Sequence, residues 1–313
     1  MTPEEIKQVL SGDYAKAEEE WKHWLQDLFG RLGLQEVPLL YQYTNMTGLK
    51  GMISESELWA TNVAYCNDSS EFHYGIGKFI EVINANISDD VDSVQHKIAT
   101  DLVARLKQQN RSDTYICCLT KNEDQLSQWR GYGDRGYGYS VGFDFKDVTN
   151  LHGVTSHAWV VYDKDEHVEM CQKMSVENVN VLVQSLPADV VNDAAAAIAD
   201  MVMEDICGGL PYFKHPLFAE EEEYRLFSSV AEVAKRQGTK DFPVFVREGQ
   251  NMLVPFVKLT HSPTRPKTRL PIRRIIVGPK VDFDKAEQSI RLLLSNNKYP
   301  DDIKIVPSPI PFV

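Results

Sequence analysis

The segment Tyr115–Phe145, YICCLTKNEDQLSQWRGYGDRGYGYSVGFDF, carries the signals that decide the fold. It opens with a short apolar run, Tyr115–Leu119, whose length and residue types predict a buried strand. It closes with Tyr139–Phe145, whose alternation predicts a half-buried strand. A polar stretch ending at Ser127–Arg130 and a turn with four glycines separate the two. We interpret the segment as two strands flanking a loop that builds a ligand pocket, with a plain hairpin as the alternative.

The loop contains residue types that suit ligand binding. Gln128, Trp129 and Arg130 stand directly before its glycines. Glycine lets a backbone approach a ligand closely. Arginine offers a planar charged fork for phosphate or carboxylate, and tryptophan offers a flat face for stacking. We therefore expect these three side chains to contact a ligand.

Composition predicts a soluble protein of one large domain or two modest ones. The chain has 313 residues, of which 43% are hydrophobic and 25% charged, as in ordinary globular proteins. No apolar run approaches the roughly 20 residues that span a bilayer. The acidic N-terminus does not resemble a secretory signal, so we expect a cytoplasmic protein without a membrane partner. Five cysteines without a CxxC pair and scattered histidines predict neither a disulfide framework nor a protein-bound metal.

Charge is distributed unevenly along the chain. The net charge of −12 argues against nucleic-acid binding by the whole surface. The stretch Lys258–Lys280, however, contains seven lysines and arginines and no acid. It is either a solvated loop or a basic strip that contacts phosphates, including those of a nucleic acid.

The order of predicted elements indicates an α+β fold. Residues 1–36 form a helical segment, and residues 37–313 form one α+β domain with a helical insertion at about 164–210 that acts as a lid, a bundle or a partner surface. Strands are mixed with helices without regular βαβ alternation, which favours a largely antiparallel sheet. Strands are expected at 37–44, 57–61, 115–119, 139–145, 157–162, 223–227, 242–247, 251–259, 274–277 and 302–306.

The four glutamates Glu220–Glu223 run directly into a strand pattern. Alternation places Glu223, Arg225 and Phe227 on one face, with Glu221 added if the strand begins early. A surface acidic cluster is the simpler interpretation. A carboxylate that points inward, however, is costly to bury unless it is paired or functional.

Several common catalytic motifs are absent from the sequence. We find no P-loop, no HExxH, no GxSxG and no GxGxxG that opens a helix after a strand. The glycines of the loop precede a strand instead, which argues against a dinucleotide fold.

Five ordered motifs resemble a bacterial family known as domain of unknown function 2971, from about residue 39 to the C-terminus. The motifs are LYQYT (40–44), LWAT (58–61) with Asn67-Asp68, LSQWRGYG (126–133), EEEYRL (221–226) and IIVGP (275–279).

A second resemblance implies chemistry. An aromatic YxYT strand, a strand ending in Ser or Thr and a later Glu-x-Glu strand occur in the order typical of ADP-ribosyltransferases, which split the nicotinamide–ribose bond of NAD. The resemblance implies that the first motif holds the adenosine ribose and nicotinamide, that Thr120 is the second motif, and that Glu223 is the catalytic glutamate. The first motif comprises Tyr41, Gln42, Tyr43 and Thr44. Relatives usually carry histidine or arginine where this chain has Gln42, which can bond a ribose hydroxyl but carries no charge.

This resemblance implies an enzyme with NAD as its substrate. Glu223 would stabilise an oxocarbenium-like ribose, and Glu221 would orient or deprotonate the acceptor. Arg130 or Arg225 would clamp the pyrophosphate. The acceptor would be a protein or a nucleic acid, or water if NAD is hydrolysed, and such an activity would suit a bacterial defence or toxin effector.

Two other functions are compatible with the residues. A non-enzymatic module would bind a nucleotide or nucleic acid through Trp129, Arg130 and the Lys258–Lys280 strip. A metal-dependent nuclease-like effector would use Asp68, Glu71 and the glutamate run around Mg²⁺.

Overall fold

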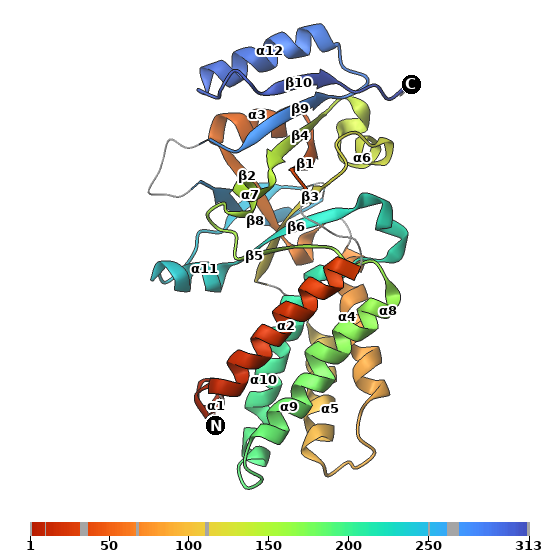
Figure 1. Ribbon diagram of the computed structural model, residues 1–313, viewed down its shortest axis with the longest axis vertical. Coiled ribbons are helices and arrows are strands. Elements are labelled where there is room, and N and C mark those ends of the chain that lie inside the picture. The colour runs from red at the N-terminus through yellow and green to blue at the C-terminus, as the bar shows by residue number, and fades with distance from the viewer. Residues whose placement is uncertain are drawn as a thin grey trace. The chain divides into compact units, whose positions relative to one another are not determined.

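The computed structural model describes residues 2–9, 11–31, 37–66, 69–109, 113–249, 251–261 and 269–311. Its chain divides into two compact units, each assembled from separate segments (Figure 1). The helical unit consists of Met1–Gln35, Asn67–Ser112 and Val160–Phe218. The sheet unit consists of Glu36–Cys66, Asp113–Trp159 and Ala219–Val313. The N-terminal segment and the insertion thus share one unit with the helices around residues 69–108.

The sheet unit is built on one mixed sheet, to which ten strands of the described residues contribute. Its order is β10-β9-β4-β1-β3-β2-β8-β7, and β6 lies between β3 and β5. Only β9 and β10 are parallel among the paired strands described, so the prediction of a largely antiparallel α+β fold is confirmed. The strands are β1 Leu39–Thr44, β2 Glu57–Asn62, β3 Thr114–Thr120, β4 Tyr139–Asp144, β5 Ser156–Trp159, β6 Glu223–Ser229, β7 Phe245–Glu248, β8 Leu253–Thr260, β9 Ile272–Val277 and β10 Lys304–Pro307.

The two strands of the Tyr115–Phe145 segment do not form a hairpin, contrary to one interpretation of the sequence. Strand β1 lies between them and pairs with β4 along its whole length. β4 is also not half-buried, because every residue from Tyr139 to Phe143 is buried. Its central position between β1 and β9 explains this, since helix α3 (Met46–Glu55) contacts β4 and the ring of Tyr41 lies against Gly142.

The sheet forks at β3. β6 pairs with all seven residues of β3 and occupies one edge of that strand. The opposite edge is shared, because β2 pairs with Tyr115 and Ile116 whereas β1 pairs with Thr120. The three residues between them pair with β6 alone among the described strands, and one of these, Cys118, has an exposed side chain. The end of β3 therefore lies where two halves of the sheet separate.

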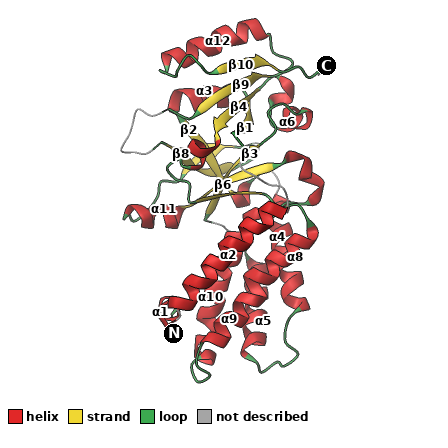
Figure 2. Cartoon of the chain, in the orientation of Figure 1, coloured by secondary structure: helices red, strands yellow, loops and turns green. Residues whose placement is uncertain are grey.

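Short helices cover the sheet unit (Figure 2). Asn45 caps α3 by accepting a hydrogen bond from the Gly48 amide at 2.8 Å, and Asp282 caps α12 in the same way. α12 packs against α3, β9 and β10 through its buried face. The helices of this unit are α3 Met46–Glu55, α6 Leu126–Gly131, α7 Phe145–Thr149, α11 Val230–Gln237 and α12 Phe283–Asn296, with single turns η1 Val63–Tyr65, η2 Asp134–Gly136 and η5 Pro216–Glu221, the last of which begins in the helical unit.

The helical unit is a bundle with an apolar core. α10 packs against α5, α9 and α1, and α4 packs against α5 and α8. Leu28, Phe79, Leu102 and Ile198 are fully or almost fully buried in it. None of the helices in the described residues is long and apolar enough to cross a membrane. The helices are α1 Pro3–Val9, α2 Ser11–Arg31, α4 Ser69–Ala85, α5 Val94–Gln108, α8 Lys164–Cys171, the π-helical turn η3 Gln172–Glu177, α9 Asn178–Ser185, α10 Val191–Gly209 and η4 Leu210–Tyr212.

Candidate functional site

The fork in the sheet brings three predicted motifs together. Tyr41 of β1 pairs with Thr120 of β3, and Thr120 pairs with Glu223 of β6. Directly paired residues of antiparallel strands point to the same face of a sheet. The first tyrosine, the threonine and the glutamate proposed from the resemblance therefore form one row across three adjacent strands.

The four glutamates do not continue this row, because the chain turns before β6. Glu222 has a left-handed backbone, with φ of 41°, so alternation is broken there. Glu221 belongs to the turn η5 and not to β6, which corrects the expectation that an early strand would place it on the face of Glu223. The half-buried Glu221 carboxylate accepts a hydrogen bond from Tyr132 Oη at 3.2 Å, and Glu222 pairs with Lys121 at 2.6 Å.

Glu223 lies in a buried ion pair. Arg225 Nε donates to Glu223 Oε1 at 2.7 Å, and an Arg225 Nη donates to Oε2 at 3.0 Å. Only 4% of the Glu223 surface and 2% of the Arg225 surface are exposed. The alternation in the sequence predicted that both side chains lie on one face of β6. Their partners on β3, Thr120 and Cys118, also share one face, which confirms the prediction. The bidentate geometry fixes the carboxylate in one orientation.

Tyr41, Tyr43 and Trp129 form a packed cluster with Ile276 on one face of the sheet. Trp129 has no exposed surface, and its ring meets Tyr43 edge-on at 4.9 Å. In this conformation the Trp129 ring is therefore not accessible to a ligand. Its indole Nε1 donates to Asp124 Oδ1 at 2.6 Å, so Trp129 anchors the segment before α6 to the sheet.

Burial controls the protonation of several polar groups around the fork. It raises the pKa of Tyr41 well above its ordinary value, and the hydrogen bond to Glu123 raises it further. Burial is also the main cause of the raised pKa of Tyr43. It raises the pKa of Cys117 to about 12. These groups stay neutral near pH 7, so the charges at the fork come from carboxylates, lysine and arginine.

The first motif is split between the two faces of β1. Gln42 and Thr44 alternate with the two tyrosines and point to the opposite face. Gln42 Nε2 lies 3.6 Å from Cys117 Sγ, across the opening of the fork. Its Oε1 is buried and has no hydrogen-bond partner among the described residues. Thr44 packs against α3, since a Cβ on Gly48 would lie 1.9 Å from Thr44 Oγ1. The motif therefore does not form one continuous binding surface.

The glycines of the central loop approach their own chain, whereas the sequence suggested approach to a ligand. A Cβ on Gly138 would lie 2.2 Å from the Thr44 carbonyl, and one on Gly133 would lie 2.5 Å from the Trp129 ring. Gly136 has φ of 88°, which only glycine adopts readily. These residues close a tight turn behind α6.

Helix α6 itself was missed, because the sequence was interpreted as a polar stretch there. Its N-terminal turn buries Gln128, whose carbonyl accepts from the amides of Tyr132 at 2.8 Å and Gly133 at 3.0 Å. Arg130 lies on the exposed side of the helix. Tyr132, 43% exposed, follows the helix and reaches Glu221. Arg130 and Tyr132 are thus the accessible side chains of the motif.

Sequence reasoning also missed the segment 121–125, KNEDQ, which follows β3. Asn122 Nδ2 donates to Glu222 Oε2 at 2.7 Å, and Gln125 Nε2 donates to the Glu220 carbonyl at 3.0 Å. Thr120 Oγ1 donates to the Glu221 carbonyl at 2.8 Å. This segment holds the glutamate turn in place. Five polar residues directly after a buried strand were the signal that could have identified it.

Three described residues of the basic strip, Lys258, Arg273 and Arg274, pair with acidic side chains, whereas Arg269 donates to Ser56 Oγ at 3.3 Å. Lys258 lies 3.0 Å from Glu57, and Arg274 lies 3.5 Å from Glu123. Arg273 pairs with Asp144 and Asp147. Arg265 and Lys267 lie outside the described residues, as do Asn67 and Asp68 of the second motif and the side chain of Glu71. Within the described residues no cluster of three histidine, cysteine, aspartate or glutamate side chains is placed to hold a metal ion.

Comparison with known families identifies the region that contains α6 and the glutamate turn. Residues 128–226 match the family described as protein of unknown function (DUF2971). The predicted resemblance to DUF2971 is thereby confirmed for these residues. The DUF2971 match begins within α6 and ends within β6. It contains residues 128–133 of the LSQWRGYG motif and the whole EEEYRL motif, whereas the motifs on β1, β2 and β9 lie outside it. A search of curated proteins and a search of solved structures each gave no match.

Proposed function

We propose that this protein is an enzyme that cleaves NAD at the nicotinamide–ribose bond and transfers ADP-ribose to a protein, a nucleic acid or water. The observation that supports the proposal is the row Tyr41–Thr120–Glu223 across β1, β3 and β6. The resemblance assigned these three residues to three separate motifs. Thr120 follows Tyr41 by 79 residues and Glu223 follows Thr120 by 103 residues, and all three meet at one fork of the sheet.

The reaction assigns a role to each carboxylate. The C1′–N bond breaks, nicotinamide leaves with the electron pair, and the ribose becomes oxocarbenium-like. Glu223, held in one orientation by Arg225, would stabilise this positive charge and accept a hydrogen bond from the ribose 2′-hydroxyl. Because Glu223 is 4% exposed, NAD would gain access only after side chains around β6 move aside.

Acceptor activation falls to a different glutamate in this proposal. Glu221 is half-buried and lies next to the exposed Tyr132. Its carboxylate would take the proton of the acceptor as the new bond to C1′ forms. Arg130, on the exposed side of α6, would contact the pyrophosphate of NAD. Consumption of NAD in this way would suit a defence or toxin effector.

The test is NAD turnover by the purified full chain, followed by release of nicotinamide. We expect Glu223→Gln and Glu221→Gln to lower turnover at least a hundredfold. Glu220→Gln is the matched control, because Glu220 lies in the same turn and is exposed. Circular dichroism of each variant separates loss of chemistry from loss of fold. Absence of both NAD binding and nicotinamide release at millimolar NAD would refute the proposal.

A further inference from the structure

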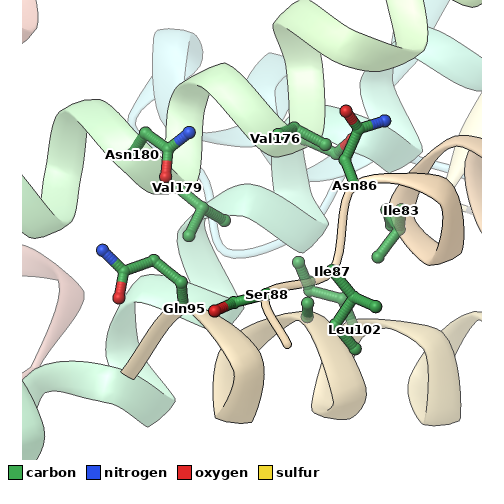
Figure 3. Close-up of a pocket in the computed structure, with 11 residues that line it drawn as sticks. Ile83, Asn86, Ile87, Ser88, Gln95, Leu102, Val176, Val179 and Asn180 are labelled. Atoms are coloured by element: carbon green, nitrogen blue, oxygen red, sulfur yellow. The ribbon is translucent and has the colours of Figure 1, made fainter. Parts of the chain in front are cut away.

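The helical unit contains a cavity of about 320 Å³ that belongs to none of the motifs described above (Figure 3). Four elements surround it: the end of α4 with the chain that follows it, the first turns of α5, the π-helical turn η3, and α9. The lining residues are Ile83, Asn86, Ile87, Ser88, Gln95, Ala99, Leu102, Ser175, Val176, Val179 and Asn180.

The π-helical turn explains why space is left there. A π-helix is wider than an α-helix and shifts the direction of the side chains that follow it; such turns occur frequently at functional sites. Met174 points to α10, where a Cβ on Gly209 would lie 2.3 Å from Met174 Cε. Ser175 Oγ donates back to the Cys171 carbonyl at 2.5 Å. Met174 therefore fills the interface with α10, whereas Ser175 and Val176 line the cavity.

The cavity is lined by polar and aliphatic side chains together. Asn180 and Gln95 lie on one side with Val179 between them, and Ile83, Ile87 and Leu102 lie on the other side, where Asn86 is next to Ile83 (Figure 3). Within the described part of the chain, the side-chain amides of Asn180 and Gln95 make no hydrogen bond. Asn86 is exposed, and its Nδ2 donates to the Val82 carbonyl at 2.8 Å. The lining therefore offers several amide donors and acceptors next to aliphatic side chains.

This chemistry restricts the ligand class. Among the described residues that line the cavity there is no lysine, arginine, aspartate or glutamate, so they offer no counter-charge to a phosphate or an ammonium group. An acyl chain would pack against the aliphatic side chains but would desolvate the amides without replacing their hydrogen bonds. Carboxamides of asparagine and glutamine bind adenine through a paired donor and acceptor, and aliphatic side chains pack against the faces of a flat ring. We propose that this cavity binds an uncharged purine base or nucleoside.

This inference is independent of the proposed NAD site, which lies in the sheet unit. It is tested by titrating the full chain with adenosine in a calorimeter. Ala99→Phe places a ring in the cavity from α5, and Ala104→Phe adds the same ring to the exposed side of that helix. We expect saturable binding to the wild-type chain and to Ala104→Phe, and at least tenfold weaker binding to Ala99→Phe at an unchanged melting temperature.

The polar lining of the cavity is tested separately. Asn180→Leu keeps the size of the side chain but removes its donor and acceptor, so adenosine should bind at least fivefold more weakly. Asn192→Leu, an exposed position on α10, is the matched control. If Ala99→Phe lowers the melting temperature, Val176→Phe is used instead of that variant, because it fills the cavity from η3.

Two results would overturn the inference. One is the absence of saturable adenosine binding to the wild-type chain. The other is binding that survives both ring-filling variants. Binding that is lost in Glu223→Gln but kept in Ala99→Phe would place adenosine at the proposed NAD site instead, which distinguishes failure of this inference from failure of the proposed function.

Discussion

At the scale of single residues, the Glu223–Arg225 pair dominates the electrostatics of the fork. Both side chains are almost fully buried, and removing one partner of a buried pair leaves an uncompensated charge that costs about 3–5 kcal/mol. We therefore expect Arg225→Met to lower the free energy of unfolding by about 3–5 kcal/mol. The double variant Glu223→Met/Arg225→Met should recover most of this loss, because no charge is then left buried. Urea unfolding at equilibrium measures both, and a double variant as unstable as Arg225→Met would contradict this account.

At the scale of elements, α6 and the turn behind it depend on two glycines in opposite ways. A Cβ on Gly138 would meet the carbonyls of Thr44 and Gly133 at 2.2 and 2.8 Å, and backbone atoms of a central strand cannot move aside easily. Gly131 lies at the end of α6, and outside its own helix no atom of the described residues lies within 4 Å of the position that an added Cβ would take. We expect Gly138→Ala to lower the free energy of unfolding by about 1–3 kcal/mol, whereas Gly131→Ala should be neutral or stabilise by up to about 1 kcal/mol. Thermal unfolding of the two variants side by side gives the answer, and equal melting temperatures would show that the turn is not tightly packed.

At the scale of the whole molecule, two effects of acidification oppose each other. The net charge of −12 shrinks as the pH falls toward the pI of about 5.2, which relieves self-repulsion. His167 acts in the other direction. It is fully buried, its Nε2 donates to the Val161 carbonyl at 2.7 Å, and burial lowers its pKa. Below its ordinary pKa of about 6.5, the unfolded chain takes up a proton that the folded chain does not, so stability falls as the pH falls from there toward the lowered pKa. We expect the wild-type chain to lose about 1 kcal/mol more than His167→Gln between pH 7.5 and 5.5. His23 is an exposed histidine of the same unit, and His23→Gln should behave as wild type. Urea unfolding at both pH values measures the loss of stability, and equal losses in all three chains would contradict the prediction.

The same three scales separate what the sequence could predict from what it could not. Local patterns located the strands, and alternation placed Glu223 beside Arg225 correctly. The strand alternation predicted the wrong position for Glu221. Glu222 adopts a left-handed backbone conformation, and no glycine in the sequence indicates it. The burial of Trp129 could not be predicted from the sequence, because a tryptophan can either stack on a ligand or fill a core, and the choice depends on β1, about 85 residues away in sequence. The insertion of β1 between β3 and β4 is likewise a pairing between distant segments, which no local pattern encodes.

The interleaving of the two units has a consequence for synthesis of the chain. The chain passes from one unit to the other at residues 35–36, 66–67, 112–113, 159–160 and 218–219. As the chain leaves the ribosome, the bundle lacks α10 until about residue 209 has emerged, and the sheet lacks β8 and β9 for longer still. Neither unit can therefore finish folding as an early, independent domain, and the nascent chain must keep apolar surfaces of both exposed for most of translation. We therefore expect chaperone dependence during expression and loss of solubility on truncation after β6.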